Sequence, residues 1–128
     1  MPQIKKVQKY GLKFDSRLEL FFYELLIKEK IPFEFQVTYQ LLEPFKYDGK
    51  AVRAMTLTVD FDFTSHGINA IVDTKGFQRN DNILKWKWFR YVVTNEYNMQ
   101  PKLFFPKNQK QCVEVVGNLK KFCKLAKL

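Results

Sequence analysis

Apolar side chains recur at helical spacing in three segments of the chain, residues 15–30, 82–96 and 111–127. The first segment ends at Ile31-Pro32, because proline cannot continue a helix. The helical spacing is carried by Leu18, Phe21, Phe22, Leu25 and Leu26 in the first segment. Ile83, Trp86, Phe89, Arg90 and Val93 are expected to lie down one side of the second, and Val115, Val116, Leu119, Phe122 and Cys123 are expected to face inward in the third. The pattern therefore predicts three helices.

Four other segments carry the features of β-strands: residues 33–41, 52–63, 68–75 and 102–105. Residues 33–41 alternate apolar and polar positions, the period of a half-buried strand. Ser65-His66-Gly67 separates the second and third segments, so we expect these to be neighbouring antiparallel strands. The predicted loops are residues 44–50, where Asp48-Gly49 signals a turn or hairpin tip, and residues 76–81. The order α-β-β-β-α-β-α predicts an α/β fold with a central mixed sheet of about four strands flanked by helices.

The length of 128 residues is that of one domain, large enough for a core without metals or disulfides. Residues 1–13 are expected to be a basic N-terminal arm, or simply a solvated terminus. Cys112 and Cys123 lie roughly 16 Å apart on the predicted last helix, too far for a disulfide, and we expect two buried thiols. With His66 as the single histidine, a Cys/His zinc site is nearly excluded, so oxygen atoms would have to bind any metal.

A net charge of +9 and a pI near 9.6 favour a polyanionic partner, DNA or RNA above all, although ribosomes and acidic lipids also attract basic proteins. No apolar run approaches the length of a membrane span, and the N-terminus lacks the apolar core of a signal peptide. We therefore expect a cytoplasmic protein with no membrane partner.

The stretch "GINAIVDTKGF", residues 67–77, places Asp73 and Lys75 at the end of a buried apolar run, where desolvating either charge is costly. If the preceding turn is centred on His66-Gly67, the numbers of opposed residues sum to 133, and Asp60 faces Asp73. Two aspartates at that spacing repel unless a cation such as Mg²⁺ lies between them. Lys75 would project from the same face. The alternatives are a simple ion pair of Asp73 with Lys75, and Asp62 in place of Asp60.

Glu19 is a further candidate, with two possible roles. Ser16-Arg17-Leu18-Glu19 fits the capping box, in which the glutamate returns to the start of its own helix. The same helix end could instead direct Glu19 at the sheet face that holds the aspartates.

These residues carry a resemblance to the PD-(D/E)XK nuclease superfamily. It is closest to a small phage-borne branch, formerly catalogued as a domain of unknown function, with the motifs "YG-x-x-F-x-S-x-x-E", "PDF", "D-x-KG" and "L-K-x-K-x-F". Here they stand as residues 10–19, 59–61, 73–76 and 84–89, with Val59 in place of the proline. The resemblance covers roughly residues 10–105 and implies a restriction-endonuclease-like core. A single D-x-K would mean little, but four motifs in order are moderately specific.

The resemblance also implies roles for individual residues. Asp60, Asp73 and the backbone carbonyl of Thr74 would bind Mg²⁺, for which Mn²⁺ could substitute, and Glu19 would hold a second ion or a metal-bound water. Lys75 would orient or activate the attacking water and offset charge on the phosphate. The expected DNA-binding residues are Lys85, Lys87, Lys13, Lys9 and Tyr10, with a solvated helix face as the alternative for Lys85 and Lys87.

The predicted function is that of a Mg²⁺-dependent endonuclease, a phosphodiester hydrolase. By analogy with phage members of the superfamily, we expect selectivity for branched DNA, as in a Holliday junction resolvase of phage DNA recombination or processing, and a homodimer in the host cytoplasm. One alternative is a restriction- or repair-type nuclease acting on duplex or single-stranded DNA. Another is a non-catalytic DNA-binding or phage-assembly protein on a nuclease scaffold.

Overall fold

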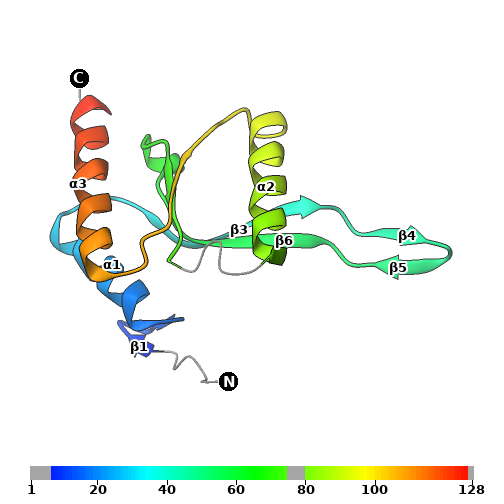
Figure 1. The fold of residues 1–128 in the computed structure, drawn as a ribbon, viewed down its shortest axis with the longest axis horizontal. Helices are drawn as coiled ribbons and strands as arrows, with labels where there is room; N and C mark the ends of the chain where they lie inside the picture. Colours follow the sequence, from blue (N-terminus) through cyan, green and yellow to red (C-terminus); the bar gives the residue numbers. More distant parts are fainter. Residues whose placement is uncertain (1–6, 75–79, 127–128) are drawn as a thin grey trace.

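The computed structural model describes residues 7–74 and 80–126. Its elements in chain order are β1 (Val7–Lys9), β2 (Leu12–Phe14), α1 (Arg17–Lys28), β3 (Glu34–Leu42), β4 (Phe45–Tyr47), β5 (Lys50–Val52), β6 (Met55–Asp62), the 3-10 helix η1 (Thr64–His66), β7 (Ala70–Val72), α2 (Asn80–Asn95), β8 (Lys102–Phe104) and α3 (Gln109–Ala126). Figure 1 shows α1 and α3 at one end of the molecule and the β4–β5 hairpin at the other. The helices agree with the predicted ones to within two residues at each end. The loop predicted for residues 76–81 lies mostly outside the described residues.

The central sheet has four strands in the order β3-β6-β7-β8. β6 is antiparallel to both β3 and β7, whereas β8 is parallel to β7. The parallel pair follows from the crossover through α2, since parallel neighbours cannot be joined by a tight turn. The predicted α/β class, with a mixed four-stranded sheet flanked by helices, is confirmed and is consistent with a restriction-endonuclease-like core.

Two hydrophobic clusters cover the two faces of β7. Ala70 and Val72 pack into a cluster with α1 and α3, whereas Ile71 packs into a second cluster with α2. This alternation is the one that a strand imposes, because successive side chains point to opposite faces. Buried phenylalanines fill much of the first cluster, and Trp86 and Phe89 anchor the second.

The long strand β6 contributes to both clusters through residues of the same parity. Leu57 and Val59 belong to the α2 cluster, and Phe61 belongs to the α1 and α3 cluster, so the change falls at Asp60. The β3–β6 ladder pairs residues on both sides of Asp60 but skips its partner position Gln36, which has a positive φ of 55°. Asp60 therefore lies where the two halves of the core meet.

The β6–β7 register agrees with the predicted one. Phe61 pairs with Val72 and Asp62 with Ile71, so the paired numbers sum to 133. The connection is η1, after which Gly67 takes a φ of 82° that an L side chain rarely adopts. The register brings Asp60 level with Asp73, which directly follows β7.

The N-terminal segment differs from the predicted arm. Residues 7–14 form the hairpin β1–β2, which turns at Tyr10-Gly11 with φ values of 57° and 72°. Such paired positive φ values are typical of a two-residue hairpin turn. Phe14 at its end is fully buried and contacts Tyr23 of α1, so this segment is part of the core. Asp48-Gly49 turns the β4–β5 hairpin in the same way, as its dipeptide predicts.

The side of α2 predicted to carry five residues in a row is only partly buried. Ile83 is 44% exposed and Arg90 is also exposed, whereas Trp86, Phe89 and Val93 are buried. In α3, Cys112 is buried but Cys123 is only partly so, and both are free thiols. Within residues 7–74 and 80–126, no helix combines the length and apolar composition that a membrane crossing requires.

Candidate metal centre

Three acidic side chains from different parts of the chain meet beside the central sheet. Asp15 follows β2, Glu19 lies in the first turn of α1, and Asp60 lies in β6. One carboxylate oxygen from each lies within 4.8 Å of those from the other two. Glu19 is 0% exposed and Asp60 only 3%, so two of the three charges are removed from water. This cluster of Asp15, Glu19 and Asp60 is called the acidic trio below.

The start of α1 places Glu19 in the trio. Ser16 is the N-cap, and its Oγ accepts a hydrogen bond from the backbone N–H of Glu19 at 3.1 Å. The carboxylate of Glu19 accepts a hydrogen bond from Nε2 of Gln36 in β3, also at 3.1 Å. The Ser16 half of the capping box is therefore present, whereas the Glu19 carboxylate points to the sheet, as in the second of the two roles considered.

Gln36 ties together the segments that carry the trio. Its Nε2 donates both to Oε1 of Glu19 and to the backbone carbonyl of Lys13 in β2, at 3.1 and 3.2 Å. The left-handed backbone at Gln36 is rare for a residue with a side chain and costs about 1–2 kcal/mol. Its amide thus links β3, β2 and α1 at the point where the ladder skips.

Hydrogen bonds join Asp60 to Asp73 and to its neighbour Thr74. The backbone N–H of Asp60 donates to Oδ2 of Asp73 at 3.3 Å, and the backbone N–H and the hydroxyl of Thr74 both donate to Oδ2 of Asp60 at 2.8 Å. Asp73 is 5% exposed and Thr74 is 7% exposed. The predicted neighbourhood of the two aspartates is confirmed, although Asp73 does not belong to the trio.

Asp62, the alternative to Asp60, has a different environment. It accepts a hydrogen bond from the Tyr39 hydroxyl, and its Oδ1 accepts from the backbone N–H and the hydroxyl of Thr64 at 2.9 and 2.6 Å. Burial, and then the hydrogen bond and negative charge of Asp62, raise the pKa of the Tyr39 hydroxyl. Asp62 therefore stabilises the start of η1 and its junction with β3.

A pocket of about 330 Å³ opens beside Asp60 and Asp73. Asn82, Lys85 and Trp86 of α2 line its other side, so a positive side chain borders the acidic residues. Lys75, predicted to lie at the same place, is outside the described residues. The carbonyl of Thr74 as a metal ligand stays a prediction.

The chain matches, over residues 2–123, the model of a family described as "Protein of unknown function (DUF1064)". It belongs to the DUF1064 family. No curated protein and no solved structure matches the chain. Common descent of DUF1064 proteins and the PD-(D/E)XK nucleases stays a prediction from the motifs.

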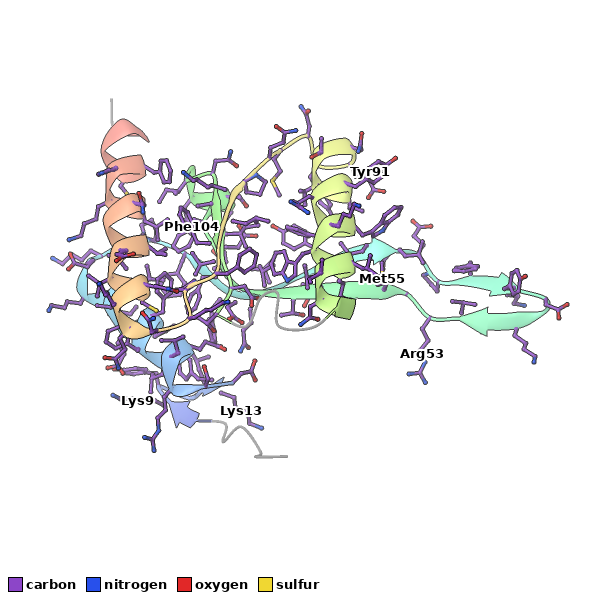
Figure 2. All side chains as sticks on the ribbon, in the orientation of Figure 1. Lys9, Lys13, Arg53, Met55, Tyr91 and Phe104 are labelled. Carbon is purple, nitrogen blue, oxygen red and sulfur yellow. The ribbon has the colours of Figure 1, made fainter. Side chains whose placement is uncertain are left out.

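The basic residues expected to bind DNA lie in two separate places, the N-terminal hairpin and α2. Lys9 forms an ion pair with Glu24 at 3.3 Å, and the Tyr10 hydroxyl donates to the same carboxylate. The hydrogen bond from Lys9 to Glu24, followed by the charge of Glu24, raises the pKa of Lys9. Lys13 is exposed on β2, and Figure 2 shows Lys9 and Lys13 near the N-terminal hairpin.

Lys85 and Lys87 lie on α2, and both line a second, larger groove of about 840 Å³. Lys87 is exposed and Lys85 is partly buried. Lys85 thus borders both the groove and the acidic pocket, whereas Lys87 borders only the groove.

Two residues of the candidate site had no distinct signal in the sequence. Asp15 directly precedes the N-cap Ser16 and looks like an ordinary acidic residue at a helix start. Gln36 lies in the alternating pattern of residues 33–41 and looks like a solvent-facing position. Gln36 is indeed exposed, but its amide contacts Glu19 at a point where β3 takes a left-handed backbone angle, which the pattern of residue types does not encode.

Proposed function

We propose that this DUF1064 protein is a metal-dependent endodeoxyribonuclease that hydrolyses phosphodiester bonds in DNA. The observation that carries the proposal is the acidic trio, whose three oxygens lie within 4.8 Å of one another beside Asp73. Ionised carboxylates at that separation repel strongly in a buried site, and a cation between them offsets both repulsion and desolvation. The net charge of +9 supports a polyanionic substrate.

The donor set suits a hard divalent cation. Carboxylate oxygens are the ligands that Mg²⁺ and Mn²⁺ prefer, and Asp15, Glu19 and Asp60 would hold the ion with Asp73 beside them. Such an ion, when bound, supplies a Lewis acid that polarises a phosphoryl oxygen and lowers the pKa of water.

The residues of the chain itself would position the DNA. Lys85 borders the acidic pocket and would attract a phosphate toward it. Gln36 keeps the Glu19 carboxylate oriented, and Thr74 does the same for Asp60 through two hydrogen bonds. Lys75 is proposed, from the resemblance alone, to assist the attack of water.

Metal binding tests the site without any substrate. We expect Mg²⁺ or Mn²⁺ to raise the thermal midpoint of the wild type, since a ligand that binds only the folded state stabilises it. Asp15→Asn, Glu19→Gln and Asp60→Asn should lose that stabilisation. The matched controls are Asp48→Asn, at the exposed tip of the β4–β5 hairpin, and Glu114→Gln, on the exposed side of α3; both should respond like the wild type. Equal responses from all five variants would refute the metal site.

Stability without metal separates a binding role from a structural one. We expect Glu19→Gln, in EDTA, to be as stable as the wild type or more so, because it removes one of three clustered charges. If Glu19→Gln instead lost several kcal/mol of unfolding free energy in EDTA, the role of Glu19 would be structural.

Cleavage of a DNA panel tests the activity and its selectivity. The substrates are a four-way junction, a flap, a single strand and a linear duplex, each with Mg²⁺ and with EDTA. We expect Mg²⁺-dependent cleavage that is faster on the two branched substrates, the junction and the flap, than on the linear duplex. Asp73→Ala should abolish cleavage while DNA binding is retained or tightened. Duplex cleaved as fast as junctions would favour a restriction- or repair-type nuclease. A protein that binds DNA but leaves all four substrates and a supercoiled plasmid intact would overturn the proposed nuclease activity.

Cutting a four-way junction symmetrically requires two active sites, so the branched-DNA proposal includes a homodimer. Sedimentation of the protein with and without a junction tests this. A monomer in both states would remove the resolvase claim but not the endonuclease.

A further inference from the structure

The outward side of α2 carries a row of large apolar side chains that the core does not use. Leu84, Trp88 and Tyr91 recur at the spacing of one helix face and are 68%, 40% and 58% exposed. The buried side of the same helix carries Trp86, Phe89 and Val93. Packing explains the buried row but not the exposed one.

This exposed row lines the groove of about 840 Å³ between α2 and the start of β6. Its other described lining residues are Met55, Lys85 and Lys87. Figure 2 shows Tyr91 on the side of α2 toward the β4–β5 hairpin, with Met55 beneath it at the start of β6. The groove therefore combines apolar side chains, on which bases can pack, with lysine ammonium groups, which can contact phosphates.

Trp88 and Tyr91 form a fixed aromatic platform. Their rings are stacked, with centroids 5.1 Å apart and planes inclined by 21°. Nε1 of Trp88 donates a 2.7 Å hydrogen bond to the carbonyl of Leu41, which holds the indole in place. Because both rings remain substantially exposed, a further flat ring can stack on the pair without rearrangement of the protein.

The groove leads to the acidic pocket. Lys85 lines both, and Met55 and Asp60 are five residues apart on β6, or roughly 16 Å along the strand. A strand of nucleic acid lying in the groove would therefore pass Lys85 on its way to Asp60 and Asp73.

We propose that this groove binds an unpaired DNA strand, whose bases stack on Trp88 and Tyr91 and whose phosphates lie against Lys85 and Lys87. The proposal rests on the proposed nuclease function and names its substrate as DNA with a single-stranded portion next to the cleaved bond. Stacking needs bases that are not enclosed in a duplex, whereas the lysines need only a backbone.

Charge argues against a second copy of the chain in the groove. The described residues that line it include two lysines and no carboxylate. A twofold contact through this face would place two positively charged patches against each other, because both partners present the same patch. The same charges attract a phosphate backbone.

Binding of a fluorescein-labelled thymidine oligonucleotide and of a duplex of equal length, both in EDTA, tests the proposal. We expect the single strand to bind more tightly than the duplex. Tyr91→Ala should weaken single-strand binding roughly five- to 150-fold, whereas Tyr91→Phe keeps the ring and should bind like the wild type. Equal affinities for the alanine and phenylalanine variants would overturn the proposal.

Salt dependence separates the two kinds of contact. Lys87→Ala should lower the slope of log affinity against log salt by about 0.7, the effect of one phosphate contact to a single strand, while Tyr91→Ala should leave the slope unchanged. Lys121→Ala, on the exposed face of α3, is the matched charge control and should behave as the wild type. If the slope for Lys87→Ala were as steep as that for the wild type, the proposed contact between Lys87 and a phosphate would be refuted.

Two outcomes distinguish this inference from the nuclease proposal. A protein that binds single strands through Tyr91 but cleaves nothing would refute only the nuclease. A protein that cleaves DNA and is indifferent to Tyr91→Ala would refute only the groove. If Tyr91→Ala converts a dimer to a monomer in sedimentation and leaves DNA affinity unchanged, the groove is a subunit contact instead.

Discussion

Gln36 in β3 donates a hydrogen bond from its amide to the buried carboxylate of Glu19 in α1, over 3.1 Å. The bond crosses from the sheet to the helix that covers it, and its donor has a left-handed backbone. A glutamine at this position therefore combines a conformational cost with a specific contact to a charged group.

Replacement of Gln36 should separate these two effects. Gln36→Ala loses the amide but keeps the strained backbone, and we expect it to lose about 1.5–3 kcal/mol of unfolding free energy, as for a hydrogen bond to a charged group. Gln36→Gly also loses the amide but relieves the strain, so it should be about 1 kcal/mol more stable than Gln36→Ala. Urea denaturation measures the difference. An alanine variant more stable than the glycine variant would contradict the cost assigned to this backbone.

Asp62 and Tyr39 should behave as a structural pair that is independent of the metal centre. Because their contact is buried, Asp62→Asn and Tyr39→Phe should each destabilise the fold by about 1–3 kcal/mol, with a coupling energy of about 0.5–3 kcal/mol in a double-mutant cycle. Asp62→Asn should still be stabilised by Mg²⁺, unlike Asp60→Asn. If Mg²⁺ no longer stabilised Asp62→Asn, Asp62 would again be a candidate metal ligand.

Two glycines make a matched pair of tests for backbone conformation. A Cβ at Gly67 or at Gly117 would meet no atom within 4 Å, so neither substitution causes a clash. Gly67 has a φ of 82° in the turn between β6 and β7, and Gly67→Ala should cost about 1–2 kcal/mol. Gly117 lies within α3, where alanine is the better helix former, and Gly117→Ala should stabilise the protein by up to about 1 kcal/mol. Thermal or urea unfolding of both variants checks the opposite signs.

Cys112 should make the protein less stable in alkaline solution. Burial raises the pKa of the Cys112 thiol from 9.0 to about 11, so the folded state favours the protonated form. The corresponding stabilisation is present in full below pH 9 and is lost as the pH rises from 9 to 11, because the unfolded chain ionises first. Between those values, the urea midpoint of Cys112→Ala should fall less steeply than that of the wild type. Parallel curves would contradict the assignment.

The thiols should also differ in reactivity toward a disulfide reagent at pH 8. Cys123, which is partly exposed, should react quickly, whereas Cys112 should react only as fast as the protein opens.

The order of the three helices and of the four central strands was predictable because each of these elements carries its own local pattern. Phe22 and Leu26 repeat at helical spacing, and the alternation in residues 33–41 marks a strand, so both are readable without the fold. The side of α2 was predicted less well, since aromatic residues lie on both of its faces. Trp86 and Trp88 look alike in the sequence, and only the position of the sheet decides that the first is 2% and the second 40% exposed.

The pairing of Asp60 with Asp73 was predictable from one short connection, because an antiparallel register is set by the turn that joins the strands. The choice between Asp60 and Asp62 was not, because it depends on Tyr39 from a strand distant in sequence. Asp15 likewise enters the site only when the hairpin β1–β2 packs beside α1.

The sequence by itself determined the three helices, the four central strands, their order and one register, because these follow from periodicity and from contacts between near neighbours. Only the tertiary structure decided which carboxylates meet, which lysine borders them and which aromatic rings stay exposed. These properties arise from packing between segments far apart in the chain, and no local pattern of residue types encodes that packing.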